Sequence, residues 1–420
     1  MSLTRNLKAI FPLGLIIFLV NGVALTNAVG DGAPAQPSPA SPSSGSGVFD
    51  VTKYGAKADG QTDDAKAFMQ AWNEACSFNG NAALLIPEGT YLLGAITFEG
   101  PCFNKGSPAV ELKGTLKAPP GVDSFPTSAW ITFRSLHGLV ISGGGTIDGQ
   151  GGAEAWTVTS CPEKTKCKIM ASSMKLISCT TGQIRGIKFV DSKGFNLRMN
   201  KCSFFYLDNL NITAPEDSPN TDGIHVSDSS TVNITNSVIG VGDDCVSLGD
   251  GNNDIFVSNI TCGPGHGISI GSLGKYKNES PVQGIHVKNC TLKGTTNGVR
   301  IKSWGGSPSL TARNITFEDI IMDDVSFPII IDQKYCPAHH CTDKPSAVQL
   351  SDVTYKNIRG SSFTRLAVNL ICSSQVPCKN MQFIDINLNY QGTDQPTASM
   401  CQHVEATTTG TMNPPPCLQL

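Results

Sequence analysis

Six residues whose side chains can transfer protons or bind anions recur at spaced positions in the middle of the chain: Asp222, Asp243, Asp244, His266, Arg300 and Lys302. Hydrolysis of a glycosidic bond needs one protonated carboxyl group, which donates to the leaving oxygen, and one carboxylate, which activates water. Crowded aspartates meet both needs, because like charges that share a site raise one pKa. An adjacent arginine and lysine would suit a sugar that carries a carboxylate, since charge-assisted hydrogen bonds offset its desolvation. These residue types therefore favour hydrolysis of an acidic sugar.

Each of these groups stands in or beside a short phrase that reads small, apolar, polar, apolar. Its four copies lie 22, 22 and 31 residues apart, measured between their first apolar residues, Ile224, Val246, Ile268 and Val299. A period of about 20 to 30 residues with one alternating strand per repeat is typical of a solenoid. Equivalent residues of successive turns stack at about 4.8 Å. We therefore expect residues far apart in sequence to meet in one polar cleft.

The alternation of side chains along a strand limits which of these residues can point into the cleft. Arg300 and Lys302 would leave the same face of a strand, because side chains alternate. The adjacent Asp243 and Asp244 would point to opposite faces of a regular strand. Both reach the cleft only if Gly242-Asp243-Asp244 is a turn or bulge, which Gly242 permits. His266 can hydrogen-bond one aspartate and help to set its proton.

The rest of the chain predicts an all-β solenoid with a cap. A first strand is expected over residues 49–56, and Thr62-Asp63-Asp64 then offers an N-cap for an amphipathic helix over 65–76 that would cover the open end. A second column of strands is expected at Ile212, Ile234, Ile260 and Ile315, and the first column continues at Ile329 and Val368. A large β-sandwich is the alternative, but it gives no reason for the 22-residue register.

The N-terminal residues predict secretion. Arg5 and Lys8 precede an apolar run at 10–20, and Thr26-Asn27-Ala28 offers a cleavage site, so residues 1–28 are interpreted as a signal peptide. A signal anchor is the less favoured alternative, because the run is short for a membrane span. Residues 29–47, rich in Ala, Pro, Ser and Gly, are expected to be a disordered linker, and residues 48–420 the β-helix catalytic domain.

The charge balance argues against nucleic acid as a partner. The chain has 31 Lys plus Arg against 34 Asp plus Glu, and removal of Arg5 and Lys8 with the leader leaves 29 against 34. Such a chain has no cationic excess with which to bind phosphates. Charged residues are only 15% and glycines number 43, which suits a β-rich fold with tight turns.

Fifteen cysteines in a secreted chain predict disulfides, with one thiol left over. The pairs expected from proximity are Cys76–Cys102, Cys161–Cys167, Cys245–Cys262, Cys336–Cys341, Cys372–Cys378 and Cys401–Cys417. The run from Cys336 to Cys341 contains two histidines and could be interpreted as a metal site. A disulfide loop is favoured, because the compartment is oxidising and no second ligand cluster is evident. No metal or cofactor is expected.

Six Asn-x-Ser/Thr sequons predict possible N-glycans, at Asn211, Asn233, Asn259, Asn278, Asn289 and Asn314. Several of these asparagines begin a strand, where Asn can simply serve the preceding turn.

Around its polar residues the chain resembles the plant polygalacturonases, which are pectin-degrading glycoside hydrolases. Four signatures of that family occur in order: Asn220-Thr221-Asp222, Gly242-Asp243-Asp244, Gly265-His266-Gly267 and Arg300-Ile301-Lys302. The resemblance extends from about Val48 to Cys417. The strings at 220–226 and 262–276 look most like the pollen-type exopolygalacturonases. The resemblance implies a single-stranded right-handed parallel β-helix.

The resemblance also implies roles for single residues. Asp243 would be the general acid, and Asp222 and Asp244 would activate water. Asn220 and His266 would orient or bind, while the substrate carboxylate would be held by Arg300 and Lys302, with Tyr335 as the cleft tyrosine. The family inverts configuration. Stacking on adjacent turns, however, favours a carboxylate separation nearer the retaining value of about 5 Å than the wider inverting one.

The implied protein is a secreted, monomeric enzyme of the cell wall, with no membrane attachment in its mature form, that hydrolyses α-1,4-galacturonan from a chain end. Four alternatives stay open. They are endo-action on the same polymer, a hydrolase for rhamnogalacturonan or xylogalacturonan, a calcium-dependent pectate lyase that leaves an unsaturated product, and an inactive polysaccharide-binding β-helix.

Overall fold

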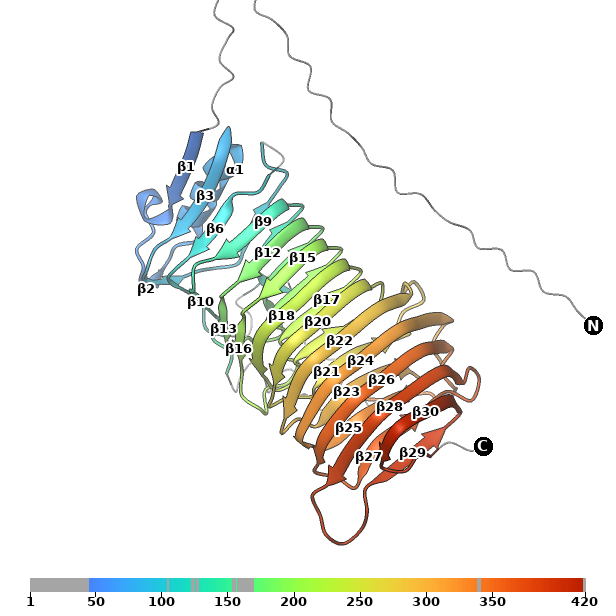
Figure 1. The fold of residues 1–420 in the computed structure, drawn as a ribbon. Coiled ribbons are helices and arrows are strands. Elements are labelled where there is room, and N and C mark those ends of the chain that lie inside the picture. The colour runs from blue at the N-terminus through green and yellow to red at the C-terminus, as the bar shows by residue number, and fades with distance from the viewer. Residues whose placement is uncertain are drawn as a thin grey trace, which may run out of the picture. The chain divides into compact units, whose positions relative to one another are not determined.

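The computed structural model describes residues 45–103, 106–121, 125, 128–152, 156, 170–337 and 341–417. These residues form a 19-stranded and an 11-stranded parallel sheet that share one stack of coils. The coils follow one another in sequence order along the stack, from the blue N-terminal to the red C-terminal end in Figure 1. The predicted leader, most of the predicted linker and the Cys161–Cys167 pair lie outside the described residues. Among the described helices, none has the length and apolar character of a bilayer-spanning segment.

The smaller sheet supplies one strand to each coil. Its members are β5 (Ile96–Glu99), β8 (Ala129–Arg134), β11 (Ser172–Ile177), β14 (Leu197–Asn200), β17 (Ile224–Ser227), β19 (Val246–Leu248), β21 (Ile268–Leu273), β23 (Asn297–Trp304), β25 (Phe327–Tyr335), β27 (Leu366–Ile371) and β29 (Ala398–Gln402).

The larger sheet covers the other sides of the coils, and several of its strands are long enough to bend around a corner. Its members are β1 (Gly45–Asp50), β2 (Asp59–Asp63), β3 (Gly80–Ile86), β4 (Thr90–Leu92), β6 (Ala109–Leu112), β7 (Thr115–Lys117), β9 (His137–Ser142), β10 (Thr146–Asp148), β12 (Thr180–Arg185), β13 (Lys188–Val190), β15 (Ser203–Asp208), β16 (Asn211–Thr213), β18 (Ser230–Gly240), β20 (Asn253–Cys262), β22 (Val282–Lys293), β24 (Leu310–Val325), β26 (Val348–Ser362), β28 (Cys378–Tyr390) and β30 (Val404–Asn413).

The register predicted for the smaller sheet is confirmed. Residues that pair in turn along it are Ile224, Val246, Ile268, Val299, Ile329 and Val368. Their side chains are buried, and the polar residues between them point outward. The all-β parallel solenoid is therefore correct, and its period follows from the repeat of apolar residues.

The predicted second column of strands is present, but the four isoleucines that marked it do not stack on one another. Ile212, Ile234, Ile260 and Ile315 all lie in strands of the larger sheet, but they occupy different rows. Ile212 pairs with Ile239, and Ile234 pairs with Leu207. The prediction failed because β18 and the longer strands after it carry several apolar rows, on either side of an irregularity such as the positive-φ Asn236.

The interior is filled by apolar side chains stacked from coil to coil. Phe317, Tyr355 and Phe383 form one such stack, with ring centroids 5.2 and 5.0 Å apart, close to the spacing of β-strands. Burial of each large apolar side chain contributes about 1.5–3 kcal/mol relative to exposure. This packing makes the stack a rigid base for the outward side chains.

The predicted cap helix is α1 (Ala65–Ser77), which buries Phe68 and Trp72 against the first coils. Its N-cap residue Asp64 makes no capping bond, because its carboxylate accepts from the backbone N–H groups of Lys57 and Ala58 instead. Before it, residues 51–54 form the short 3₁₀ helix η1 (Val51–Tyr54), where the sequence predicted the continuation of a strand. Strand β1 begins at Gly45, so the last three residues of the predicted linker belong to the sheet.

Five of the predicted disulfides are present: Cys76–Cys102, Cys245–Cys262, Cys336–Cys341, Cys372–Cys378 and Cys401–Cys417. The expectation of a single free thiol is wrong. Cys179, Cys202 and Cys290 are all free and buried in the described residues. They face the interior of the coils, where a thiol packs as a small apolar group.

Candidate active site

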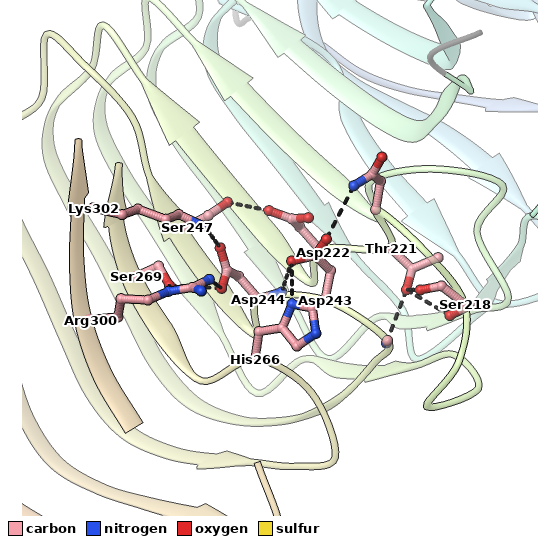
Figure 2. Close-up of polar contacts among 12 residues, drawn as sticks. Ser218, Thr221, Asp222, Asp243, Asp244, Ser247, His266, Ser269, Arg300 and Lys302 are labelled. Carbon is pink, nitrogen blue, oxygen red and sulfur yellow. Dashed lines mark hydrogen bonds and ion pairs between the residues drawn. The ribbon is translucent and has the colours of Figure 1, made fainter. Parts of the chain in front are cut away.

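The candidate residues gather on the outward face of four consecutive strands of the smaller sheet. Asp222 immediately precedes the Gly223 that leads into β17, Asp244 stands two residues before β19, and His266 two residues before β21, while Arg300 and Lys302 lie within β23. Figure 2 shows these side chains gathered in one place, with contacts from Asp244 to Arg300 and Lys302 and from Asp243 to His266. The stacking of coils thus joins residues that are up to 80 positions apart in the chain.

The segment at Gly242 is a bend, as the sequence required. The N–H of Gly242 donates to the hydroxyl of Thr221 at 3.0 Å, and that hydroxyl in turn contacts Ser218 at 2.7 Å. A Cβ at position 242 would collide with the backbone oxygen of Ser218, so only glycine allows this approach. The bend lets Asp243 and Asp244 both face the cleft.

Asp243 is the most accessible of the three aspartates. Its side chain is 18% exposed, whereas that of Asp244 is 2% exposed. One carboxylate oxygen lies 3.0 Å from Nδ1 of His266, and the other accepts from the amide of Asn220 at 3.2 Å. The expected contact between His266 and an aspartate is therefore present, and Asn220 holds the same carboxylate from the other side.

Asp244 is neutralised by the two cations. Its oxygens accept from the Arg300 guanidinium at 2.7 Å and from Lys302 Nζ at 2.8 Å. The hydroxyl of Ser269 donates to the same carboxylate at 2.7 Å and accepts from Arg300 Nε at 2.9 Å. Arg300 and Lys302 thus bind a carboxylate of the protein itself.

Asp222 forms no ion pair with any cation in the described part of the chain. It accepts one hydrogen bond, from the hydroxyl of Ser247 at 2.6 Å. That serine also lies 2.8 Å from Nδ1 of His225, so when Ser247 donates to Asp222 the histidine nitrogen must donate to the serine. Burial and the nearby Arg198 lower the pKa of His225 to about 3, which keeps the ring neutral.

The environments separate the protonation states of Asp222 and Asp243. Burial, together with the charges of Asp243 and Asp244, raises the pKa of Asp222 well above its ordinary value. Burial also disfavours the charged form of Asp243, but its contacts with His266 outweigh this and hold its pKa below the usual range. The pKa values of these two neighbouring carboxyl groups are therefore shifted in opposite directions, and such a separation suits the paired acid and base that hydrolysis requires.

Tyr335, at the end of β25, borders the cations. Its ring centroid is 5.3 Å from Lys302 Nζ and 5.6 Å from the ring of Trp304. It does not touch the aspartates through any hydrogen bond between described residues. Its position is that of a wall residue beside Lys302.

A metal ion is a poor fit to the cluster. Ligand atoms of Asp243, Asp244 and His266 lie within 4.8 Å of one another. Both oxygens of Asp244, however, already accept from the cationic Arg300 and Lys302. A metal ion would have to compete with two fixed positive charges.

Sequence reasoning assigned no role to Ser247, Ser269 and His225, although each occupies the polar position of the repeated phrase. The spacing in the sequence could have identified the two serines. Ser247 follows Asp222 by 25 residues and Ser269 follows Asp244 by 25 residues, so each serine lies one coil after the aspartate that it contacts. It also overlooked the preceding coil, in which Leu197, Arg198 and Met199 occupy the apolar, polar and apolar positions of the phrase and pair with β17.

Comparison with known proteins places this geometry in a family. A family model described as "Glycosyl hydrolases family 28" matches residues 76–411. An exopolygalacturonase of Zea mays is 45% identical over 391 residues, which cover 92% of this chain and 95% of the relative. A polygalacturonase of Gossypium hirsutum is 44% identical and covers 89% of this chain and 91% of its own.

Solved structures share the fold. A hyperthermoactive exopolygalacturonase from Thermotoga maritima superposes with a TM-score of 0.73 at 18% identity, over 86% of this chain and 90% of its own. A polygalacturonase from Erwinia carotovora gives 0.66 at 23% identity, over 89% and 99%.

Proposed function

Because the chain belongs to glycosyl hydrolases family 28, we propose that it hydrolyses the α-1,4-galacturonosyl linkages of polygalacturonate. The observation that carries this proposal is the meeting of Asp222, Asp243 and Asp244 beside Arg300 and Lys302. The names of the plant relatives, exopolygalacturonase and polygalacturonase, support the same substrate.

In the proposed mechanism Asp243 gives its proton to the leaving glycosidic oxygen. It is the aspartate that reaches furthest into the cleft, so its carboxyl group is best placed to touch the substrate. Water attacks the anomeric carbon and gives its proton to Asp222. Asp222 suits the base better than Asp244, because it accepts one hydrogen bond while Asp244 accepts from two cations and a serine.

The raised pKa of Asp222 and the lowered pKa of Asp243 favour a proton on Asp222, whereas these roles need it on Asp243. A uronate entering the cleft adds negative charge and excludes water, and both effects favour the protonated form of the more exposed Asp243. We propose that substrate binding moves the proton from Asp222 to Asp243. His266 and Asn220, which hold the Asp243 carboxylate, orient it for the transfer.

Arg300 and Lys302 are proposed to bind the carboxylate of one galacturonate residue. An arginine carries five N–H donors and a lysine three, so both retain donors after binding Asp244. Their pairing with Asp244 fixes the two side chains before substrate arrives. Tyr335, against Lys302, would form part of the wall for the same sugar.

We propose exo-action, on the strength of the relatives with that name. Inversion of configuration is proposed from the family resemblance alone. Detection of the anomer first released, by ¹H NMR, decides between inversion and retention: β-galacturonate supports inversion and the α-anomer contradicts it.

We also propose that residues 1–28 are removed as a signal peptide and that the mature monomer, with residues 29–44 of its linker, is extracellular. Five of the six sequon asparagines are exposed, which suits N-glycosylation; they are Asn211, Asn259, Asn278, Asn289 and Asn314. Asn233 is partly buried.

A time course of products from polygalacturonate tests the proposed function. Monomer as the sole early product supports exo-hydrolysis, and a ladder of oligomers supports endo-action instead. A product with absorbance in the near ultraviolet, lost on addition of a chelator, would identify a lyase. If neither the polymer nor its oligomers were cleaved, the proposal would be refuted and a polysaccharide-binding protein would be favoured.

A further inference from the structure

A second pair of cations lines the cleft on the N-terminal side of the aspartates. Lys175 in β11 pairs in register with Arg198 in β14, which pairs with His225 in β17. All three occupy the outward column that continues through Ser247 and Ser269 to Arg300. Arg198 and Arg300 are separated by four strand spacings, or roughly 19 Å at about 4.8 Å each. The aspartates lie between them.

These two cations differ from Arg300 and Lys302 in having no carboxylate in contact among the described residues. Neither Lys175 nor Arg198 forms an ion pair with another described residue, and the buried Nε of Arg198 has no hydrogen-bond partner. A partly buried cation without an ion-pair partner is costly, because no hydrogen-bonded anion replaces the hydration that it loses. Burial and the charge of Arg198 lower the pKa of Lys175, and burial lowers that of Arg198. An arriving carboxylate would relieve both effects.

The guanidinium of Arg198 is held in place by an aromatic ring. Its Cζ lies 5.8 Å from the ring centroid of Phe195, and the same ring stacks on His225 at 5.1 Å. Contact with a ring face stabilises an arginine and leaves its in-plane N–H groups free for a carboxylate. Arg198 is also close enough to Asp222 for the two charges to attract. The arginine therefore stands at the edge of the aspartate cluster with a fixed orientation.

We propose that Arg198 and Lys175 form a second carboxylate-binding subsite, which holds a galacturonate residue on the opposite side of the cleaved bond from Arg300 and Lys302. This inference rests on the proposed function, since only a polymer of uronates presents a carboxylate on both sides of one linkage. Two different residues of one polymer, one on each side of the cleaved bond, would then each be held by a pair of cations. The subsite would select an unesterified residue at this position.

Trigalacturonates with a single methyl ester, placed on each of the three residues in turn, test this subsite. Arg198→Gln should lower kcat/KM on the unesterified trimer about 10- to 100-fold, the loss expected for a charge-assisted hydrogen bond. On one of the three esters Arg198→Gln should not lower kcat/KM further, because esterification has already removed the carboxylate that Arg198 binds. Arg198→Lys should give an intermediate loss. Arg313→Gln, an exposed arginine of the larger sheet bonded to Gln283, is the matched control and should equal the wild type.

Provided that the wild type cleaves the trimer, two results would overturn the subsite. One is an equal loss of kcat/KM from Arg198→Gln on all three esters. The other is an Arg198→Gln variant whose kcat/KM equals that of the Arg313→Gln control. Failure of the wild type to cleave would instead refute the proposed function. In that event calorimetric titration with trigalacturonate still decides: weaker binding to Arg198→Gln than to Arg313→Gln supports the subsite, and equal binding refutes it. Unchanged melting temperatures show that both variants are folded.

Discussion

Each of the three aspartates has a different set of neighbours, although all share one cleft. Asp244 is bound by Arg300 and Lys302, Asp243 by His266 and Asn220, and Asp222 by a serine alone. Chemically identical side chains thus acquire different proton affinities from the donors around them. The roles proposed for them follow from these contacts and can be tested one residue at a time.

Asp243→Asn should lower kcat on polygalacturonate by roughly 10² to 10⁴ without unfolding the protein, because an amide cannot donate the proton to the leaving oxygen. The loss should shrink on an aryl galacturonide whose leaving group needs no proton. Asp222→Asn should show no such recovery, since activation of water is still missing. Recovery in Asp222→Asn rather than Asp243→Asn would exchange the two roles, and near-normal turnover of Asp243→Asn would exclude it as the acid.

Asp222→Asn and Asp243→Asn should have opposite effects on stability. The folded pKa of Asp222 is raised, so the stability of the wild type falls as pH rises from the unfolded pKa through the folded one. Asp222→Asn should therefore melt at a higher temperature than the wild type at pH 7, and this difference should be smaller at pH 4. The folded pKa of Asp243 is lowered, so its stabilisation is present above the unfolded pKa and is lost as pH falls through the folded pKa. Asp243→Asn should therefore lower the melting temperature at pH 7.

Melting curves of the wild type and both variants at pH 4 and pH 7 provide this comparison. A shift of the same sign for both variants at pH 7 would contradict the assigned proton positions.

The bend before β19 positions two of the three aspartates. It depends on contact between Gly242 and the Ser218–Thr221 segment of the preceding coil. The N–H of Gly223 in turn donates to the carbonyl of Asp244 at 2.9 Å, and that of His266 to the carbonyl of Asp243 at 2.8 Å. Backbone contacts between three coils therefore fix the bend, and the chemistry of the cleft depends on them.

Gly242→Ala should reduce both stability and activity. The added methyl group would displace the Ser218 backbone, a type of overpacking that costs about 1–3 kcal/mol. Displacement of the aspartates by about 1 Å should also lower kcat by up to about 10². Gly106→Ala is the control, because nothing lies within 4 Å of a Cβ at that position. Urea unfolding and kcat measure the two effects, and a Gly242→Ala variant indistinguishable from Gly106→Ala would refute the importance of the bend.

In the solenoid as a whole, each coil contacts only its neighbours, so an end must be covered. Trp72 of α1 packs at 4.9 Å from Phe98 and 6.3 Å from Phe133, measured between ring centroids, and is almost fully buried. The helix thereby covers apolar surface of the first coils that would otherwise meet solvent or another chain.

Trp72→Ala should destabilise the protein by about 3–5 kcal/mol, as expected for loss of a buried indole. The folded variant should retain its kcat, because the candidate site lies on β17–β23, several coils away. Phe363→Ala removes an aromatic side chain that is 64% exposed and should change stability by less than about 0.5 kcal/mol. Urea titration and light scattering are the measurements, and an unchanged midpoint for Trp72→Ala would show that the cap is dispensable.

The sequence alone determined the stack of coils, the rows of the smaller sheet and the six polar residues of the cleft. These follow from alternation and repeat length, which are local properties of the chain. Its prediction for the larger sheet failed in register, because the bends inside long strands such as β18 leave no clear mark in the pattern of apolar residues.

Only the tertiary structure decided in which direction the pKa of each carboxyl group is shifted and which carboxylate is bound by cations. Lys302 reaches Asp244 across 58 residues of sequence, and Arg198 stands unpaired beside Asp222 rather than in a salt bridge. Such contacts depend on where long side chains end in space, and that position is set by coils contributed from distant parts of the chain. The pKa of a buried group follows those positions, so no spacing in the sequence could have specified it.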